Sequence, residues 1–272
     1  MIPESRIPLI LIEIPGLDRS KPLIEILTKT KIFDLIIFPA VMFKSGDINW
    51  KVDHKYLKTS YGRKITDGEI GAAISHKEAQ KILALSEIGG VILEDDARIE
   101  DLELFEDLVK RFIRNIPHSK SVLSLLPWVH LNVYNLESKK RKRNIYKLLG
   151  STPLSVGYVI SKAAASELAA ANELVRYLPD WPENNVNFFT SIEGVICHGD
   201  INGKSVIGDG SRVKVSKIKK ILIYSGFAYL RNYKLFGTPW NYIRMIYRPY
   251  VFWKLDNYVF SRKSLYLRLK SF

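Results

Sequence analysis

The stretch Val91-Ile-Leu-Glu-Asp-Asp96 joins a short apolar run to three adjacent carboxylates. The apolar part predicts a buried strand, so the acids are expected at its carboxyl end. Three neighbouring anions repel one another, which is costly near a core unless they share a cation. Mg²⁺ and Mn²⁺ prefer carboxylate oxygens and often bind through one or two of them together with substrate phosphates. The stretch therefore indicates a site for a metal-bound phosphorylated ligand.

Strands and helices are predicted to alternate around this stretch. Besides 91–96, strands are expected at 8–14, 35–38, 121–126 and 154–160, and helices at 21–30, 67–87, 101–116 and 162–177, with a loop at 44–64. Ser20 and Ser161 are expected helix caps, and Thr66-Asp67-Gly68-Glu69 fits a capping box. The alternation predicts an α/β layered fold with a largely parallel sheet. In such sheets ligands bind beyond the carboxyl ends of the strands, where the three acids are expected.

The charge of the chain is divided sharply between two regions. Residues 1–211 contain 27 Lys and Arg and 27 Asp and Glu, whereas residues 212–272 contain 14 Lys and Arg and a single acid. The second region also carries 15 of the 31 aromatic residues. The hydrophobic content of 47% is sufficient for a substantial core. We expect one catalytic domain at 1–211 and a basic, aromatic extension at 212–272.

A second motif lies one helix ahead of the acidic triplet. The segment Asp67-Gly-Glu-Ile-Gly-Ala-Ala-Ile-Ser-His76, followed by the acids, resembles glycosyltransferase family 25, the bacterial lipooligosaccharide galactosyltransferase family. Weaker similarities lie at 17–20, 157–161 and 179–181, so the resemblance covers about residues 8–200. Ala72 stands where the family usually has cysteine, and the turn at 17–20 lacks a second arginine often found there.

The resemblance implies a GT-A-type, Rossmann-like fold and a metal-assisted inverting transfer of a hexose. The implied donor is a UDP-sugar, with UDP-galactose favoured. The implied acceptor is a lipid-linked oligosaccharide of lipooligosaccharide or lipopolysaccharide type. The implied cofactor is Mn²⁺ or Mg²⁺, which would neutralise the departing diphosphate as a Lewis acid.

The acidic triplet would divide its roles in such a transferase. Asp96 is expected to bind the metal, while Glu94 and Asp95 are expected to contact the nucleotide-sugar. The alternative is a solvated turn in which Asp96 or Asp101 caps the next helix.

The helix ahead of the triplet would supply further donor contacts. By the resemblance Glu69, Gly71, Ser75 and His76 bind the nucleotide-sugar, since Ser75 and His76 lie about two turns after Glu69, near the same helix face. The alternatives are that Glu69 only completes the capping box and that His76 is a core histidine with satisfied hydrogen bonds.

Two later residues are candidates for catalysis and metal binding. Asp180, between two prolines, is the candidate general base that removes a proton from the acceptor hydroxyl. Glu183 and Glu193 are rivals for that role. His198 is a candidate second metal ligand, although a lone histidine is more often structural.

The extension and the single cysteine predict where the protein works. Aromatic and cationic residues alternate at 221–260, which suits an anionic membrane surface, and the alternative is packing against the core or a second subunit. Cys197 is the only cysteine, and neither a signal peptide nor an apolar run long enough to span a bilayer is evident. We expect a peripheral protein on the cytoplasmic face of the inner membrane. There are two rival functions. One is a nucleic-acid-binding protein, but the sequence contains no recognised nucleic-acid-binding motif. The other is a non-catalytic membrane-associated protein.

Overall fold

The computed structural model describes residues 6–61, 64–115, 119–126, 145–147, 156–179, 186–191 and 195–198. These residues form a seven-stranded sheet with the order β2-β1-β3-β7-β5-β8-β6. Its strands are β1 (Ile7–Glu13), β2 (Phe33–Pro39), β3 (Gly89–Glu94), β5 (Ser121–Ser124), β6 (Ile145–Lys147), β7 (Gly157–Ser161) and β8 (Asn187–Ser191). Two further strands, β4 (Ala97–Ile99) and β9 (Ile196–His198), pair with each other.

Most strands of the sheet point in one direction. Strand β1 pairs in parallel with β2 and β3, and β5 pairs in parallel with β8. Strand β7 lies antiparallel between β3 and β5, so β5 and β8 have the same direction as β1, β2 and β3. Strand β6 is antiparallel to β8. The predicted α/β fold with a mostly parallel sheet is therefore confirmed, with β7 as an internal reversed strand that the sequence analysis did not anticipate.

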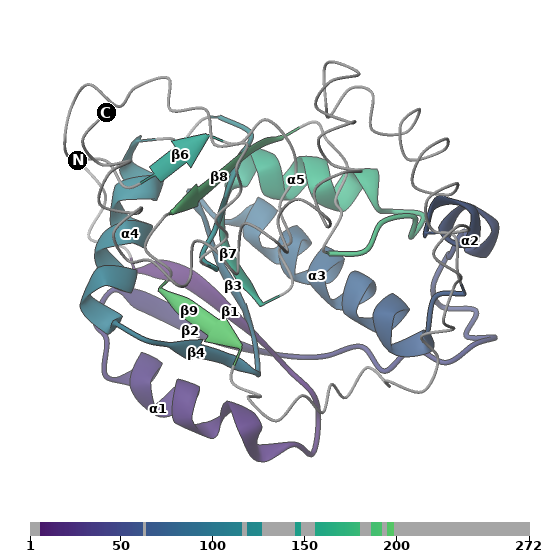
Figure 1. Cartoon of the computed structure of the whole chain (residues 1–272), viewed down its shortest axis with the longest axis horizontal. Coiled ribbons are helices and arrows are strands. Elements are labelled where there is room, and N and C mark those ends of the chain that lie inside the picture. The colour runs from purple at the N-terminus through teal and green to yellow at the C-terminus, as the bar shows by residue number, and fades with distance from the viewer. Residues whose placement is uncertain are drawn as a thin grey trace, which may run out of the picture. The chain divides into compact units, whose positions relative to one another are not determined.

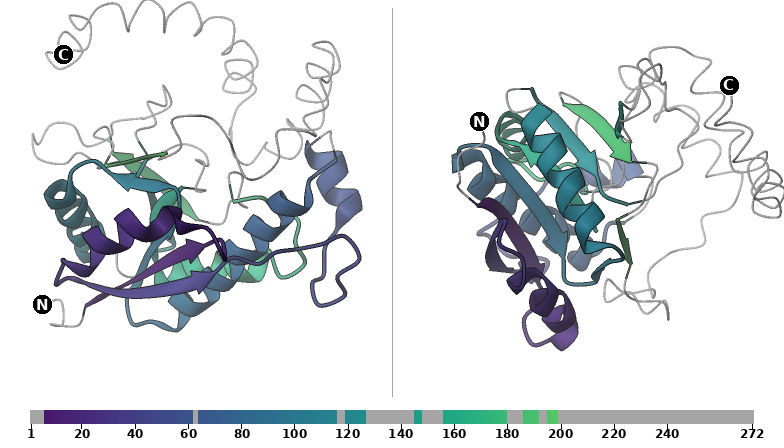
Figure 2. Two further views of the ribbon diagram at one scale, coloured as in Figure 1. Left: turned by 90° about the horizontal axis from the view of Figure 1, so that it is seen from below. Right: turned by 90° about the vertical axis from the view of Figure 1, so that its left-hand side faces the viewer.

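Helices cover both faces of the sheet (Figure 1). On one face, α1 (Lys21–Thr28) and α4 (Leu102–Asn115) enclose a core that contains Leu9, Leu11 and Leu93. On the other face, α3 (Asp67–Leu85) and α5 (Lys162–Ala171) enclose Ile10, Ile12 and Ile92. Figure 2 shows the same layers from two further directions. Successive residues of a strand point to opposite faces, so the all-apolar runs of β1 and β3 fill both cores.

The predicted loop at 44–64 contains a helix, α2 (His54–Tyr61). Two features of the local sequence explain why it forms. The Asp53 carboxylate accepts a hydrogen bond from the backbone N–H of Tyr56 at 2.9 Å, which caps the helix start. Leu57 is 1% exposed in a third core cluster beside α3. Polar composition hid this short amphipathic helix, so the loop prediction was wrong over these residues.

One predicted helix end and one predicted cap also differ from the structure. Helix α5 ends at Ala171 rather than near Tyr177, because the Asn172 side-chain oxygen accepts hydrogen bonds from the backbone N–H groups of Arg176 and Tyr177. Ser161 caps the start of this helix as expected, accepting from Ala164 N–H. Ser20 makes no side-chain cap on α1; its hydroxyl donates to Glu13 instead.

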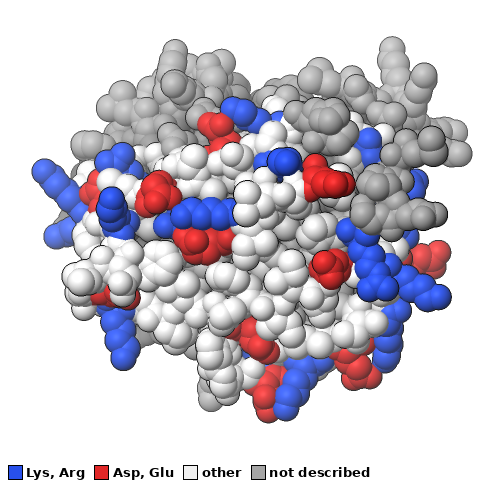
Figure 3. Space-filling view, turned by 180° about the vertical axis from the view of Figure 1, so that it is seen from behind, with Lys and Arg blue, Asp and Glu red and all other residues white. Residues whose placement is uncertain are grey.

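The described surface has mixed charge, and several predictions lie beyond it. On the face shown in Figure 3, acidic and basic side chains are interspersed rather than gathered by sign. No helix in the described part of the chain is both long and apolar enough to cross a membrane. The basic extension at 212–272, Asp180, Glu183 and Glu193 lie outside the described residues.

Candidate functional site

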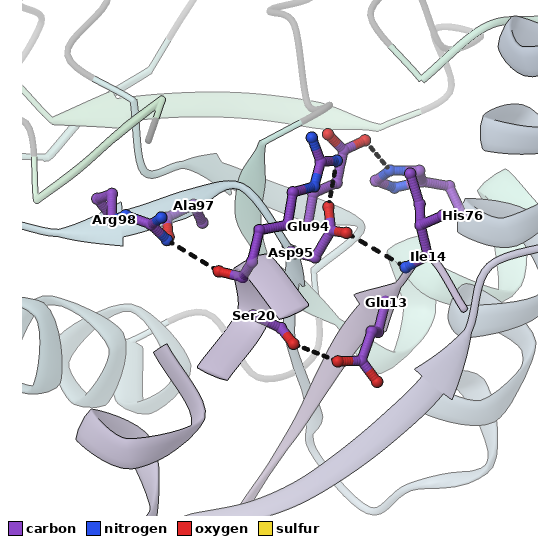
Figure 4. A network of polar contacts seen from close by, with 9 residues as sticks. Glu13, Ile14, Ser20, His76, Glu94, Asp95, Ala97 and Arg98 are labelled. Carbon is purple, nitrogen blue, oxygen red and sulfur yellow. Dashed lines mark hydrogen bonds and ion pairs between the residues drawn. The ribbon is translucent and has the colours of Figure 1, made fainter. Parts of the chain in front are cut away.

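The acidic triplet lies at the carboxyl end of β3, as the sequence predicts. Glu94 is the last residue of the strand and pairs with Ile12 of β1, and its backbone N–H donates to the Val156 carbonyl at 3.0 Å. Asp95 and Asp96 form the turn that leads into β4. Because side chains alternate along a strand, Glu94 follows Ile92 toward the α3 face and Asp95 follows Leu93 toward the α1 face. Figure 4 shows Glu94 directed at His76 and Asp95 at Ile14.

Glu94 heads a chain of buried hydrogen bonds. Its Oε1 lies 2.9 Å from His76 Nε2, and His76 Nδ1 lies 3.1 Å from the hydroxyl of Tyr158 on β7. The Gln80 amide nitrogen donates to the same hydroxyl at 3.0 Å. His76 and Tyr158 also stack, with ring planes 18° apart. His76 is 3% exposed and Glu94 19%, so the chain reaches the surface at the Glu94 carboxylate.

For a neutral His76 ring, donor counting assigns a direction to each hydrogen bond in this chain. An amide nitrogen only donates, so Tyr158 accepts from Gln80 and has its own proton left for His76 Nδ1. Burial raises the pKa of Tyr158 well above its usual value, with nearby Glu94 adding to the shift, so the phenol keeps that proton. With Nδ1 as an acceptor, neutral His76 carries its proton on Nε2 and donates it to Glu94. The chain thus presents a fixed neutral donor to the carboxylate.

Asp95 is held differently, by a cation and a backbone group. Arg19 Nη2 donates to Asp95 Oδ1 at 2.5 Å, and the Ile14 backbone N–H donates to Oδ2 at 3.2 Å. Asp95 is 3% exposed and Arg19 25%. The hydrogen bond to Asp95 raises the pKa of Arg19, and the charges of Asp96 and Glu94 act in the same direction. Both carboxylate oxygens of Asp95 thus bind protein groups, which leaves less capacity for the donor contact expected of this residue.

The Arg19 turn is itself anchored to the end of β1. Arg19 lies in a short 3-10 helix, Asp18–Ser20, whose last residue donates its hydroxyl to Glu13. Arg98 Nη1 donates to the Arg19 carbonyl at 3.4 Å. These contacts bring the turn after β1 against the turn after β3. The sequence analysis noted the Leu-Asp-Arg similarity but did not predict that Arg19 would pair with Asp95.

The start of α3 uses its polar residues to hold neighbouring backbone. Thr66 and Glu69 form the predicted capping box, so the structural reading of Glu69 is confirmed. Ser75 Oγ donates to the Gly71 carbonyl and accepts from the Val41 N–H, both at 2.8 Å. A Cβ on Gly71 would lie 2.4 Å from the Val41 carbonyl oxygen, so only glycine allows this close approach. Donor contacts by Glu69, Gly71 and Ser75 remain predictions.

The metal prediction stays a prediction. Strand β9 places the backbone of His198 opposite Ala97, one residue after Asp96. No group of three or more His, Cys, Asp or Glu in the described part of the chain is arranged to hold a metal ion by itself. Glu94 and Asp96 nevertheless provide carboxylate oxygens at one turn, and Mg²⁺ commonly takes one or two carboxylates and completes its shell with phosphates. The residues fit a metal that arrives with a diphosphate rather than one caged by protein.

The comparison with protein families decides the class of the protein. The family model described as glycosyltransferase family 25 (LPS biosynthesis protein) matches residues 16–181, more than half of the chain. The chain belongs to glycosyltransferase family 25. A search of curated proteins found no match. The matched range includes the Arg19 turn, α3, the acidic triplet and β7, so the contacts described above lie within the family domain. The protein is therefore a glycosyltransferase of the type that acts in lipopolysaccharide biosynthesis.

Sequence reasoning did not single out Tyr158 and Gln80, two residues of the hydrogen-bond chain that ends at Glu94. Tyr158 stands in the run Gly157-Tyr-Val-Ile-Ser161, which reads as a buried strand. A tyrosine in such a run needs a partner for its hydroxyl, so this signal could have been used. Gln80 stands four residues after His76, and their shared helix face was equally visible.

Proposed function

We propose that this transferase moves a hexose, with galactose favoured, from a UDP-sugar to a lipid-linked oligosaccharide of lipopolysaccharide or lipooligosaccharide type. The proposed reaction proceeds with inversion on a GT-A-type fold. The observation that supports it most directly is that the three carboxylates at the end of β3 have different surroundings. One of its three carboxylates is neutralised by Arg19, one is held by a neutral histidine, and one lies in the turn beside β9.

The charge of this arrangement suits a divalent cation. Three carboxylates and one guanidinium sum to a charge of −2 when His76 is neutral, and Mn²⁺ or Mg²⁺ would balance it. Asp96 would hold the metal, and His198 is the proposed second ligand. Such a metal supplies Lewis-acid stabilisation of the charge that develops on the leaving diphosphate.

Three carboxylates of the protein would have separate tasks in the transfer. Glu94, oriented by His76, would accept a hydrogen bond from a hydroxyl of the donor sugar or its ribose. Asp95 would keep the Arg19 turn against the site and so shape the nucleotide pocket. Asp180 would remove the proton of the attacking acceptor hydroxyl, because inverting transfer needs a base on the acceptor side.

Donor binding tests the proposal most directly. Thermal shift of the full-length protein would be measured with UDP-galactose, UDP-glucose, UDP-N-acetylglucosamine and a GDP-sugar, each with Mn²⁺ and with a chelator. We expect stabilisation by a UDP-sugar that depends on Mn²⁺, following ligand linkage. If none of the UDP-sugars stabilises the protein in Mn²⁺, the enzymatic proposal fails.

We further propose that the extension at 212–272 brings the enzyme to its lipid-linked acceptor at the cytoplasmic membrane face. The support is its composition, 14 cations against one acid. Each cation near an anionic bilayer contributes on the order of 1 kcal/mol. Replacing Arg244, Arg248 and Lys254 with glutamine in the full chain should reduce co-sedimentation with anionic vesicles but not with neutral ones. Unchanged co-sedimentation would exclude the electrostatic role.

A further inference from the structure

A hollow opens between α3 and α5, on the same side of the sheet as His76. Its cavity volume is about 20 Å³, and it is open to solvent on one side. Its polar lining comes from His76, Lys77 and Gln80 on α3 and from the segment Asn172–Pro179 after α5. His76 is therefore shared: its ring borders the hollow, while its Nε2 faces Glu94. The His76 side chain therefore lies between the hollow and the acidic site.

Lys77 is a largely buried cation that lines this hollow. Its side chain is 4% exposed, and its nearest acidic atom is Glu78 Oε1 at 3.4 Å, which also pairs with Lys81 at 3.2 Å. The Lys77 ammonium lies 5.1 Å from the centre of the Trp50 ring. It makes no hydrogen bond to any other described residue, although an ammonium carries three donors. Burying such a group is costly unless a partner completes its coordination.

Gln80 adds an unused acceptor next to this cation. The residue is 7% exposed and lines the hollow. Its amide nitrogen donates to Tyr158, whereas its carbonyl oxygen accepts no hydrogen bond from the described part of the chain. The hollow thus offers a positive donor from Lys77 and a neutral acceptor from Gln80. A ligand that satisfies both carries an anionic group and a hydroxyl.

Ion pairs link α3 to the segment after α5 beside the hollow. Glu173, next to the lining residue Asn172, pairs with Lys81 at 3.2 Å. The pKa of Glu173 lies below its usual value because of the hydrogen bond and charge of Lys81, with smaller contributions from Lys77 and Lys51. Lys81 thus pairs with both Glu78 and Glu173, which leaves Lys77 with only a shared carboxylate oxygen as its acidic partner among the described residues.

We propose that the hollow binds the carboxylate or phosphate of an acidic sugar in the acceptor, with Lys77 contacting the anion and Gln80 a hydroxyl. This proposal rests on the proposed function for its assignment to the acceptor. The assignment follows from position, because one wall of the hollow is His76, whose Nε2 faces Glu94 at the proposed donor site. An acidic unit held there would direct a neighbouring hydroxyl of the acceptor toward the donor site.

The binding experiment uses the full-length protein and three small sugars. Glucuronic acid and glucose 6-phosphate probe the carboxylate and the phosphate, and glucose is the uncharged control; titration is followed by calorimetry or by chemical shifts. We expect at least one acidic sugar to bind about tenfold or more tightly than glucose, as a charged hydrogen bond contributes. The acidic sugar that binds more tightly shows whether the hollow prefers a carboxylate or a phosphate. Equal binding of all three sugars would overturn the proposal.

Matched variants separate a binding role of Lys77 from a structural one. Lys77→Met should lose the preference for the acidic sugar, whereas Lys81→Met, on the same helix and also paired with Glu78, should retain it. Trp50→Leu removes the ring beneath Lys77 without altering the lining of the hollow, and should also retain it. If Lys77→Met binds the acidic sugar like the unmodified protein, or Trp50→Leu loses binding equally, the subsite is excluded.

Donor measurements on the same variants keep this proposal distinct from the proposed function. UDP-galactose with Mn²⁺ should stabilise Lys77→Met as it stabilises the unmodified protein, while the KM for an acidic acceptor rises and kcat is retained. Should no UDP-sugar bind any variant, the proposed UDP-sugar donor is wrong, but the sugar titrations still decide the hollow. If Lys77→Met does not fold, Lys77→Gln provides the same charge removal with a polar side chain.

Discussion

The two sides of the acidic end of β3 solve the same electrostatic problem in different ways. Toward α1, Asp95 is almost fully buried and binds the permanent cation Arg19 and a backbone N–H. Toward α3, Glu94 reaches the surface and binds His76, a neutral donor fixed by Tyr158. A carboxylate paired with arginine is neutralised, whereas one that accepts from a neutral imidazole keeps its charge. Of these adjacent acids, Asp95 therefore stabilises the structure, and Glu94 can contact a ligand.

The pleat of the strand creates this division. Glu94, the last residue of β3, points to the α3 face, whereas Asp95 begins the turn and meets the end of β1 and Arg19. Asp96, in the turn after the strand, follows neither face and lies beside the β4–β9 pair. The difference between the two sides gives a graded set of expectations for mutation. Substitution of Asp96 should lower activity most, and substitutions on the Asp95 side should mainly lower stability. Substitutions on the His76 side should lower activity by a smaller factor.

Asp96→Asn is expected to have the largest effect on activity. The amide keeps the size of the side chain but removes the charge that would hold the metal. We expect Mn²⁺-dependent transfer to fall by about 10²-fold or more, since charge stabilisation of the leaving group is lost. Metal-dependent initial rates measure the loss, and circular dichroism should show an unchanged fold. Full activity in this variant would exclude Asp96 as the metal ligand.

Arg19→Met tests whether the Asp95 side is structural. The substitution leaves a buried carboxylate without its cation, so the free energy of unfolding should fall by about 2 kcal/mol, moderated by the partial exposure of Arg19. Urea denaturation measures the change. Adding Asp95→Asn should restore part of the loss, because the uncompensated charge disappears. Lys21→Met, whose partner Asp18 is largely exposed, is the control and should change stability little.

His76→Asn tests the opposite side. Asparagine cannot reach Glu94 from the position of the imidazole Nε2, so the carboxylate loses its fixed donor. We expect kcat/KM to fall by about 10- to 100-fold, the range for loss of a group that orients a functional ligand. Steady-state kinetics with the UDP-sugar donor measure the effect. A loss confined to thermal stability, with normal kinetics, would assign His76 to the core alone.

Local patterns predicted the skeleton of this fold better than its contacts. The capping box at Thr66, the buried run of β3 and the cap at Ser161 involve residues close in sequence, so their rules act on a few neighbouring positions. The reversed β7 and the short strands β6, β8 and β9 depend on pairing between distant segments. A single sequence without covariation contains no register for such pairs, so the strand at β7 was predicted but its direction was not, and β6, β8 and β9 were not anticipated.

The same distinction applies to the site. The position of the acids at the end of β3 follows from one local pattern, and it was predicted correctly. The partner of each acid depends on which element faces it after folding, and Arg19 lies 76 residues from Asp95 along the chain. Sequence reasoning grouped Glu94 and Asp95 as equivalent donor ligands because the residue types are alike. Their environments, one paired with a guanidinium and one with an imidazole, differ only in three dimensions.

Tyr158→Phe should have the smallest effect and is the most specific test of the α3 side. It removes one hydroxyl, so the Gln80 amide loses its acceptor and His76 Nδ1 its donor, while the stacked ring remains. We expect a loss of about 1 kcal/mol in the free energy of unfolding and less than about a tenfold fall in kcat/KM.

The decisive measurement for this variant is the tautomer of His76, read from imidazole ¹⁵N chemical shifts. In the unmodified protein Nδ1 should be unprotonated and Nε2 protonated, because Tyr158 donates to one and Glu94 accepts from the other. The variant should show a mixture of tautomers. An unchanged spectrum would mean that Glu94 alone orients the ring. Since Asp95 belongs to a separate network, the stability losses of Tyr158→Phe and Arg19→Met should add within about 0.5 kcal/mol; coupling beyond that would show that the two sides of β3 act together.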